Sequence, residues 1–304
     1  MSRAVHVLPT PRWDGSSVII PPPEAGPGAW AGAPSAVMVD GVVYLAYRLR
    51  LRIGQGRGYG NMIARSVDGV HFEPLGLIEK FRFGAESLER PALTVTPDGL
   101  WRLYISAATP GTKHWRVDLL EADAPEKLVD AEPRTVLPGD DTIGVKDPVL
   151  LLDGGRWHLW ASVHPLEFDE HADRMTTRYA TSPDGIDWTW QGTALQGRPG
   201  QWDARGVRLT SVLPTEDGLL ASYDGRATAA ENWEERTGTA RGDRLPGGLF
   251  GPLTADDVPP IGSPYPPNGL RYASVLALPD GRYRIYYEAT RPDGAHELRS
   301  ELQS

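Results

Sequence analysis

Apolar and polar residues alternate along this chain in short runs of strand length, and one arrangement of them recurs. An apolar run is followed by an Asp-Gly turn and then by a second run that is rich in aromatic residues. Asp-Gly between alternating runs is typical of a β-hairpin, because both residues tolerate the positive φ of a type I′ turn. Five copies of this arrangement occupy residues 34–48, 91–106, 148–162, 209–225 and 272–288.

The five copies are spaced almost evenly. Their first residues lie 57, 57, 61 and 63 positions apart, so a unit of about 60 residues repeats along the chain. A second motif, SVDGVHF at Ser66 and SPDGIDW at Ser182, reads as the turn between a third strand and a fourth. Four antiparallel strands per unit, repeated radially, predict an all-β fold. We expect one five-bladed β-propeller domain over residues 1–304; the alternative, a β-sandwich, predicts no such period.

The two ends of the chain are expected to share the last blade. After Glu288 there is room for only one more strand, near residues 296–301, so the fifth blade lacks its outermost strand. Residues 4–8 or 18–20 near the N-terminus are predicted to supply it. Such a strand would close the ring and cover a sheet edge.

Composition excludes several classes of protein. The formal net charge of −9 argues against nucleic-acid binding, which needs a cationic surface. The absence of cysteine excludes disulfides, a thiol nucleophile and thiolate zinc sites. We find no apolar run of signal-peptide or membrane-spanning length, which predicts a soluble, cytoplasmic protein without a membrane partner. No metal motif is present, and the Gly-rich residues 54–60 lack a following helix, so we expect no metal and no cofactor.

Short motifs at the repeat openings carry a resemblance to a known group of enzymes. Lys146-Asp147-Pro148 opens the third unit, and Glu89-Arg90-Pro91 opens the second. Together with the Ser-x-Asp-Gly-x-x-aromatic turns, these motifs resemble the five-bladed propeller glycosidases of glycoside hydrolase families 43, 32 and 130. The resemblance covers essentially the whole chain, and it implies a carbohydrate substrate and a role for Asp147 in orienting it and stabilising the transition state.

The chain departs from that family pattern in two units. Families 43 and 32 have an acid at the first opening, where this chain has Gly32-Ala33-Pro34. They have a general-acid Glu near the fourth opening, where this chain has Val207-Arg208. The usual catalytic pair is therefore not at its usual positions.

Glycosidic bond cleavage needs a carboxylic acid to protonate the leaving oxygen and a carboxylate to act as base or nucleophile. The candidates expected at the channel mouth are acids near strand openings and second-strand ends: Asp147, Glu89, Glu86, Asp203, Asp224 and Glu288. Structural roles compete with each of them. Asp147 could cap its strand or pair with Lys146, Glu89 could pair with an arginine, and Asp203 and Asp224 could be turn residues.

The residues just before the five openings are expected to converge on the channel. They are Ala33, Arg90, Asp147, Arg208 and Arg271, so three arginines share this predicted register. Arginine binds carboxylate or phosphate through a planar fork, so Arg90, Arg208 and Arg271 are candidates for holding an anionic substrate group. The alternative is that each pairs with a nearby acid.

Other candidate substrate contacts follow from position. Tyr272 lies next to Arg271, and His114 and His164 follow the second strands of units two and three. Trp101, Trp157 and Trp160 fall within strands and are expected in the core, whereas Trp115, Trp202 and Trp233 fall in loops and could stack on a sugar.

Residues 226–267 show little alternation and are predicted to form long loops over one face. The resulting hypothesis is a glycoside hydrolase-like enzyme that acts on a small carbohydrate or glycoside. Whether this substrate carries an anionic group is left open. The alternative is a non-catalytic carbohydrate-binding propeller, or an enzyme of small-molecule metabolism on the same scaffold.

Overall fold

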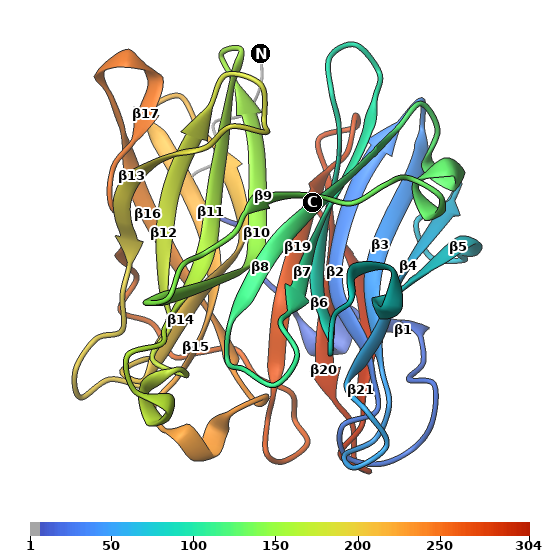
Figure 1. The fold of residues 1–304 in the computed structure, drawn as a ribbon, viewed down its shortest axis with the longest axis vertical. Coiled ribbons are helices and arrows are strands. Elements are labelled where there is room, and N and C mark those ends of the chain that lie inside the picture. Colours follow the sequence, from blue (N-terminus) through green and yellow to red (C-terminus); the bar gives the residue numbers. More distant parts are fainter. Residues whose placement is uncertain (1–6) are drawn as a thin grey trace.

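Each predicted hairpin forms the two inner strands of one blade of a five-bladed β-propeller (Figure 1). The computed structural model describes residues 7–304. The first three blades have four antiparallel strands each: β2 (Trp30–Val39), β3 (Val42–Arg50), β4 (Gly58–Ser66) and β5 (Glu73–Glu79); β6 (Leu88–Val95), β7 (Trp101–Ala108), β8 (Trp115–Ala122) and β9 (Arg134–Leu137); β10 (Ile143–Asp153), β11 (Arg156–Pro165), β12 (Thr176–Ser182) and β13 (Thr189–Leu195).

The remaining two blades are built differently at their outer edges. The fourth has β14 (Gly206–Pro214), β15 (Gly218–Arg226), β16 (Arg236–Leu245) and the short β17 (Leu249–Phe250) and β18 (Thr254–Ala255). The fifth has β19 (Leu270–Ala277), β20 (Tyr283–Thr290) and β21 (His296–Gln303), and β1 (Ser17–Ile20) completes it. Helical structure in residues 7–304 is limited to 3-10 turns: η1 (Trp13–Gly15), η2 (Lys80–Phe83), η3 (Pro125–Val129), η4 (Asp169–His171), η5 (Ala229–Glu231) and η6 (Pro246–Gly248).

The N-terminal strand closes the ring, as the sequence predicts. β1 pairs antiparallel with β21, with Ser17 opposite Ser300, and Figure 1 shows the two strands in the same part of the molecule. Of the two predicted donor segments, residues 18–20 are confirmed in this role. The other, residues 4–8, falls largely outside the described residues.

The core lies between the blades. One apolar cluster joins Ile63 of the first blade to Leu93 and Leu103 of the second, and similar clusters fill the other interfaces. Trp101 and Trp160 belong to these clusters, and Trp157 is buried, as expected for strand tryptophans. The inner strands are also tied by serine side chains, because Ser35 Oγ accepts the amide hydrogen of Leu93 at 2.9 Å in the next blade.

Residues 226–267 are not a run of loops, because they contain β16, β17 and β18. β16 pairs with β15 over eight residues. Glycine hides this strand in the sequence, since a Cβ at Gly238 would strike the Trp202 ring and one at Gly242 would strike Leu253. Glycines that allow close packing therefore stand where alternating apolar residues would otherwise mark the strand. No helix within residues 7–304 has the length and apolar character needed to cross a membrane.

Candidate functional site

A bulge interrupts each inner strand where it reaches the channel. On β2, β10 and β19 the pairing with the second strand skips two residues, and the first skipped residue is left-handed: Ala33 (φ 51°), Asp147 (φ 54°) and Tyr272 (φ 56°). Such φ values are costly for residues other than glycine and are typical of functional sites. The bulges re-aim side chains toward the channel mouth.

These bulges correct the predicted register in three blades. The first pairs beyond the bulges involve Ser35, Pro91, Val149, Ser211 and Ser274. Counted back from these pairs, Arg208 and Arg271 are equivalent to Gly32 and Lys146, one residue earlier than Ala33 and Asp147, whereas Arg90 lies one residue later than Ala33 and Asp147 do. The prediction that Arg90, Arg208 and Arg271 share one register is therefore wrong. Proline does not mark the register, because Pro34 and Pro148 lie within their bulges while Pro91 pairs with Ile105 beyond its own.

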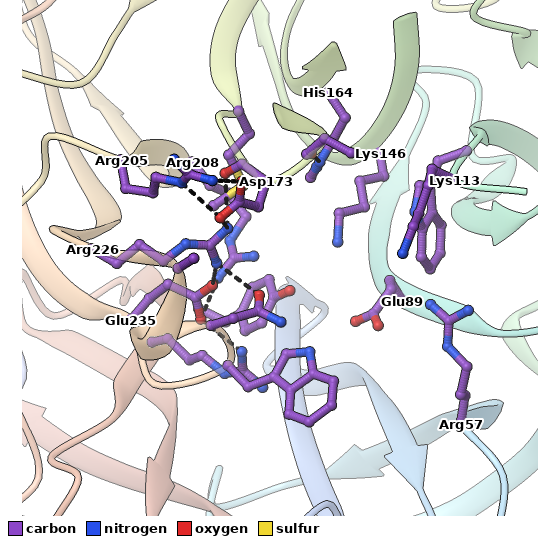
Figure 2. A pocket seen from close by; sticks show the side chains of 18 of the residues that line it. Arg57, Glu89, Lys113, Lys146, His164, Asp173, Arg205, Arg208, Arg226 and Glu235 are labelled. Atoms are coloured by element: carbon purple, nitrogen blue, oxygen red, sulfur yellow. Dashed lines mark hydrogen bonds and ion pairs between the residues drawn. The ribbon is translucent and has the colours of Figure 1, made fainter. Parts of the chain in front are cut away.

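A cavity of about 520 Å³ opens at this end of the channel (Figure 2). Aromatic side chains and a surplus of cations line it. Of the predicted site residues, Glu89, His164, Arg208, Arg271 and Tyr272 line the cavity, whereas Arg90, Asp147, Asp224, Glu288 and Asp203 do not. Trp30, Trp115 and Trp233 contribute the indole rings, and Lys146 lies against Trp115 with its Nζ 4.7 Å from the ring centre.

One side of the cavity consists of ion pairs, which we call the paired wall: Asp173, Arg205, Arg208, Arg226, Glu235 and Arg271. Glu235 lies 2.5 Å from Arg226 and 2.8 Å from Arg271. Burial opposes ionisation of Glu235, but these arginines and Arg208 hold its pKa well below the ordinary value. Figure 2 shows the dashed contacts gathered on this side, around Glu235 and Asp173. The acids here are permanently ionised partners of arginines.

Glu89 belongs to a second, smaller network. Arg48 contacts Glu89 with one nitrogen and Glu288 with the other, the latter at 2.7 Å. Glu288 is fully buried, and Arg271 and His296 each approach it to 2.7 Å. Although burial raises the pKa of Glu288, Arg271 and Arg48 outweigh that effect and hold it well below the ordinary value. Glu288 cannot act as a proton donor, whereas Glu89 keeps its carboxylate at the cavity.

The unusual first opening has a structural cause. A Cβ at residue 32 would collide with the Glu288 carboxylate, so Gly32 leaves the space that Glu288 of the fifth blade fills. An acid thus lies at the first opening, but it is supplied by another blade.

Asp147 lies beneath the cavity and is fully buried. Its Oδ2 is 3.4 Å from the hydroxyl of Tyr272, 3.5 Å from Arg208 and 3.6 Å from Lys146. Burial raises the pKa of this carboxyl, but Lys146 and Arg208 outweigh it, so the net shift is downward. Asp147 is an ionised anchor for three side chains that do line the cavity.

Asp224 is also buried beneath the cavity. Its Oδ2 accepts hydrogen bonds from Arg208 at 2.9 Å and from the backbone amide of Tyr272 at 2.9 Å. Burial raises its pKa to about 6, against the opposing effect of Arg208. Asp224 therefore holds the Arg208 side chain and the backbone of the bulge at Tyr272 in position.

The other predicted contacts divide between the cavity and its surroundings. Asp203 accepts hydrogen bonds from Tyr223 and Arg198 at 2.8 and 2.9 Å, away from the cavity lining. His114 lines an adjoining cavity of about 860 Å³. His164 hydrogen-bonds the Ala172 carbonyl through Nδ1, and burial lowers its pKa to about 3, so it is neutral. Of the loop tryptophans, Trp115 and Trp233 line the cavity, while Trp202 stacks on Tyr223.

Several site residues were missed by sequence reasoning. Arg48 occupies the same second-strand position as Asp224 and Glu288, so the repeat identifies it as a candidate site residue. Arg226 occupies the same second-strand position as Arg50 and His164, so the repeat also points to it. Glu235 lies outside the repeated hairpins and carries no such signal. Arg90 was expected to face a ligand, but its guanidinium donates to the Thr210 carbonyl at 2.6 Å inside the ring. Among residues 7–304, no cluster of three or more His, Asp or Glu is arranged to hold a metal ion.

The fold is that of solved five-bladed propeller carbohydrate enzymes. A glycosyl hydrolase from Bacteroides ovatus shares 15% identity over 97% of this chain and 95% of its own, with a TM-score of 0.64. The GH43_1 enzyme from Xanthomonas citri complexed with xylotriose shares 16% over 94% and 89%, with a TM-score of 0.66. The β-1,2-mannobiose phosphorylase from Listeria innocua, in complex with β-1,2-mannobiose, shares 17% over 96% and 92%, with a TM-score of 0.64. No family model and no curated protein sequence matches the chain.

Proposed function

We propose that this protein binds a carbohydrate or glycoside in the 520 Å³ cavity and cleaves a glycosidic bond there, with Glu89 as the catalytic carboxylate. The observation that carries the proposal is the position of Glu89. It reaches the cavity from the blade-two opening and, among the described residues, forms an ion pair with Arg48 alone, whereas Glu235 is bound by several arginines. Carbohydrate enzymes of the same fold, including ones bound to xylotriose and mannobiose, support a sugar as the ligand.

The aromatic lining suits a sugar ring. Trp30, Trp115, Trp233 and Tyr272 present flat apolar faces around a polar floor, which is the usual composition of a small-molecule site. A pyranose placed against these rings would direct its hydroxyl groups toward Glu89 and Lys146.

The second catalytic role is a proton transfer, for which Lys146 is placed. Burial lowers the pKa of Lys146 to about 8, which suits proton donation near neutral pH. Asp147, 3.6 Å away, holds the ammonium group in place without facing the cavity. In this proposal Asp147 is a positioning residue, and Lys146 takes the place of the acid that the fourth opening lacks.

Turnover of aryl glycosides and oligosaccharides, including xylotriose and β-1,2-mannobiose, tests the proposal with and without inorganic phosphate, so that hydrolysis and phosphorolysis are separated. Glu89→Gln removes the charge with little change in volume and should lower kcat by at least about 100-fold while sugar affinity is kept. Asp147→Asn should also lower kcat and should shift the pH profile assigned to Lys146. Glu79→Gln, at the exposed end of β5, is the matched control and should leave kcat unchanged.

A non-catalytic carbohydrate-binding propeller is the second candidate. The locking of Glu235 and Glu288 by arginines favours it, because a glycosidase ordinarily keeps two functional carboxyl groups. Measurable sugar binding with no turnover of any glycoside would establish this candidate instead.

A further inference from the structure

Arg50 is the buried cation at the cavity that the paired wall does not explain. It ends β3, is only 4% exposed and lines both the 520 Å³ cavity and the adjoining one. Within residues 7–304, its buried Nε has no hydrogen-bond partner, and no carboxylate lies within 4 Å of its guanidinium group. A buried charge without a partner is costly, so this one has a reason to be kept.

Two tryptophans hold Arg50 in place of an acid. The guanidinium carbon lies 4.2 Å from the ring centre of Trp30 and 4.6 Å from that of Trp233. The two rings meet edge to face, with centres 5.6 Å apart and an angle of 71° between their planes, so Arg50 lies in the corner that they form. A cation–π contact does not occupy N–H donors, so those of Arg50 remain available to a ligand. Trp233 has a φ of 78°, which is strained for a tryptophan, and such strain is typical of ligand-binding segments.

The electrostatic surroundings of Arg50 favour an anion. Burial, followed by the nearby charges of Arg48, Arg271 and Arg57, lowers the pKa of Arg50 to about 9, so it remains protonated at neutral pH. An oxyanion placed against it would relieve this repulsion.

Two further cations lie at the mouth shared by the two cavities, and with Arg50 they form what we call the open rim: Arg50, Arg57 and Lys113. Lys113 has no carboxylate within 4 Å among the described residues, and Arg57 reaches only the solvent-exposed Glu86, at 3.3 Å. Exposed pairs of this kind are weak and are easily exchanged for a ligand. Figure 2 shows Arg57 and Lys113 on the same side of the cavity as Glu89, across from the paired wall. Asp169, on η4, is an exposed acid at the same mouth.

We propose that the open rim binds an oxyanion carried by the sugar, a carboxylate or a phosphate, with Arg50, packed against Trp30 and Trp233, as its principal ligand. The inference rests on the proposed function, because it places the charged substituent of the substrate next to a ring bound at Glu89. It differs from the sequence-based expectation, in which Arg90, Arg208 and Arg271 bind the anion. Arg90 does not line the cavity, and Arg208 and Arg271 donate hydrogen bonds to Asp224 and Glu288.

Calorimetric titration tests the proposal with three kinds of probe: a hexuronate, a hexose 6-phosphate and the uncharged hexose. Arg50→Met keeps an apolar side chain against the indole rings and removes the guanidinium group. It should weaken binding of the anionic probes by about 10- to 100-fold while changing the uncharged hexose by less than about twofold. Arg50→Lys should also weaken them, because an ammonium cannot form the bidentate pair. Arg65→Met, on the exposed part of β4, is the matched control and should match the parent protein.

The three probes identify the ligand, and they show whether a failure concerns this inference or the proposed function. Tighter binding of the hexuronate assigns a carboxylate, and tighter binding of the hexose phosphate assigns a phosphate. Circular dichroism verifies the folding of both Arg50 variants. Equal affinity of Arg50→Met and parent for the anionic probes, or a parent that does not prefer them, overturns the inference and leaves the role of Glu89 standing. A parent that binds no sugar overturns both.

Discussion

Arg208 on the fourth blade and Arg50 on the first are both buried at the same cavity, yet they are held by different kinds of neighbour. Arg208 lies 2.9 Å from Asp224, 3.5 Å from Asp147 and 3.6 Å from Glu235, so its charge is matched inside the protein. Arg50 lies against two indole rings and, within residues 7–304, has no carboxylate within 4 Å. Burial alone therefore does not tell a structural arginine from a binding one. The distinction lies in whether the N–H donors are already used.

The largest expected effect is the loss of stability when the paired wall is broken. Arg208→Met leaves three buried carboxylates without their shared cation and should lower the free energy of unfolding by about 3–5 kcal/mol. Arg50→Met is the matched substitution and should change it by less than about 1 kcal/mol, since the lost cation–π contacts are offset by reduced repulsion. Urea denaturation followed by circular dichroism measures both. Equal losses in the two variants would remove the distinction between wall and rim.

Acid should destabilise the paired wall. Because the pKa of Glu235 is lowered in the folded state, its stabilising contribution is fully present above the unfolded-state pKa of about 4.5 and is lost as the pH falls below it. Glu235→Gln should therefore be much less stable than the parent at pH 7, and the difference should shrink between about pH 4.5 and pH 3. The measurement is the unfolding free energy of both proteins across this range. A difference that stays constant with pH would mean that Glu235 is not held as an ionised partner.

Salt should weaken anion binding at the open rim and leave the stability of the paired wall nearly unchanged. Raising the ionic strength from about 0.05 M to about 0.5 M shortens the Debye length and screens exposed charges more than buried ones. Binding of the anionic probes should weaken several-fold, while the melting temperature changes little. A melting temperature that falls as steeply as the affinity would indicate that the wall is open to solvent.

The smallest expected effect is that of Lys113→Gln. Lys113 is exposed and carries no ion pair among the described residues, so its removal should leave stability unchanged and reduce anion affinity about two- to threefold. Parallel calorimetric and melting measurements on Lys113→Gln and the Arg65→Met control verify this. An effect as large as that of Arg50→Met would move the centre of the anion site to the exposed lysine.

The sequence predicts the ring better than it predicts the site. The period, the hairpins and the closing strand follow from local signals, namely Asp-Gly turns and alternating apolar residues. The place of Asp147 at an inner-strand opening and the second-strand positions of Asp224 and Glu288 also follow from the repeat, but the burial of Asp147 beneath the cavity does not. What a repeat cannot supply is the one-residue shift at Arg208 and Arg271, which depends on where each bulge falls.

Partner choice among charges is also beyond the sequence. Glu235 comes from a segment without a repeat, and it decides the roles of Arg208, Arg226 and Arg271 by binding to all three. Arg50 resembles any arginine at a strand end until the positions of Trp30 and Trp233 are known. The contacts of Glu235 with Arg271 and of Arg50 with Trp233 join different blades, so only the folded ring reveals them.

The pairing of Ser17 with Ser300 has a consequence for the order in which this protein is made. During synthesis β1 emerges before the first four blades, but its partner strand β21 emerges only after all of them. The first four blades can assemble as they appear, since their strands are neighbours in the chain, while β1 waits without a partner. Until β21 arrives, an unpaired strand and an unsealed blade interface remain exposed, and both invite association with other chains. A ribosome that stalls within the last blade would therefore release a chain far more prone to aggregate than one lacking the same number of residues from a surface loop.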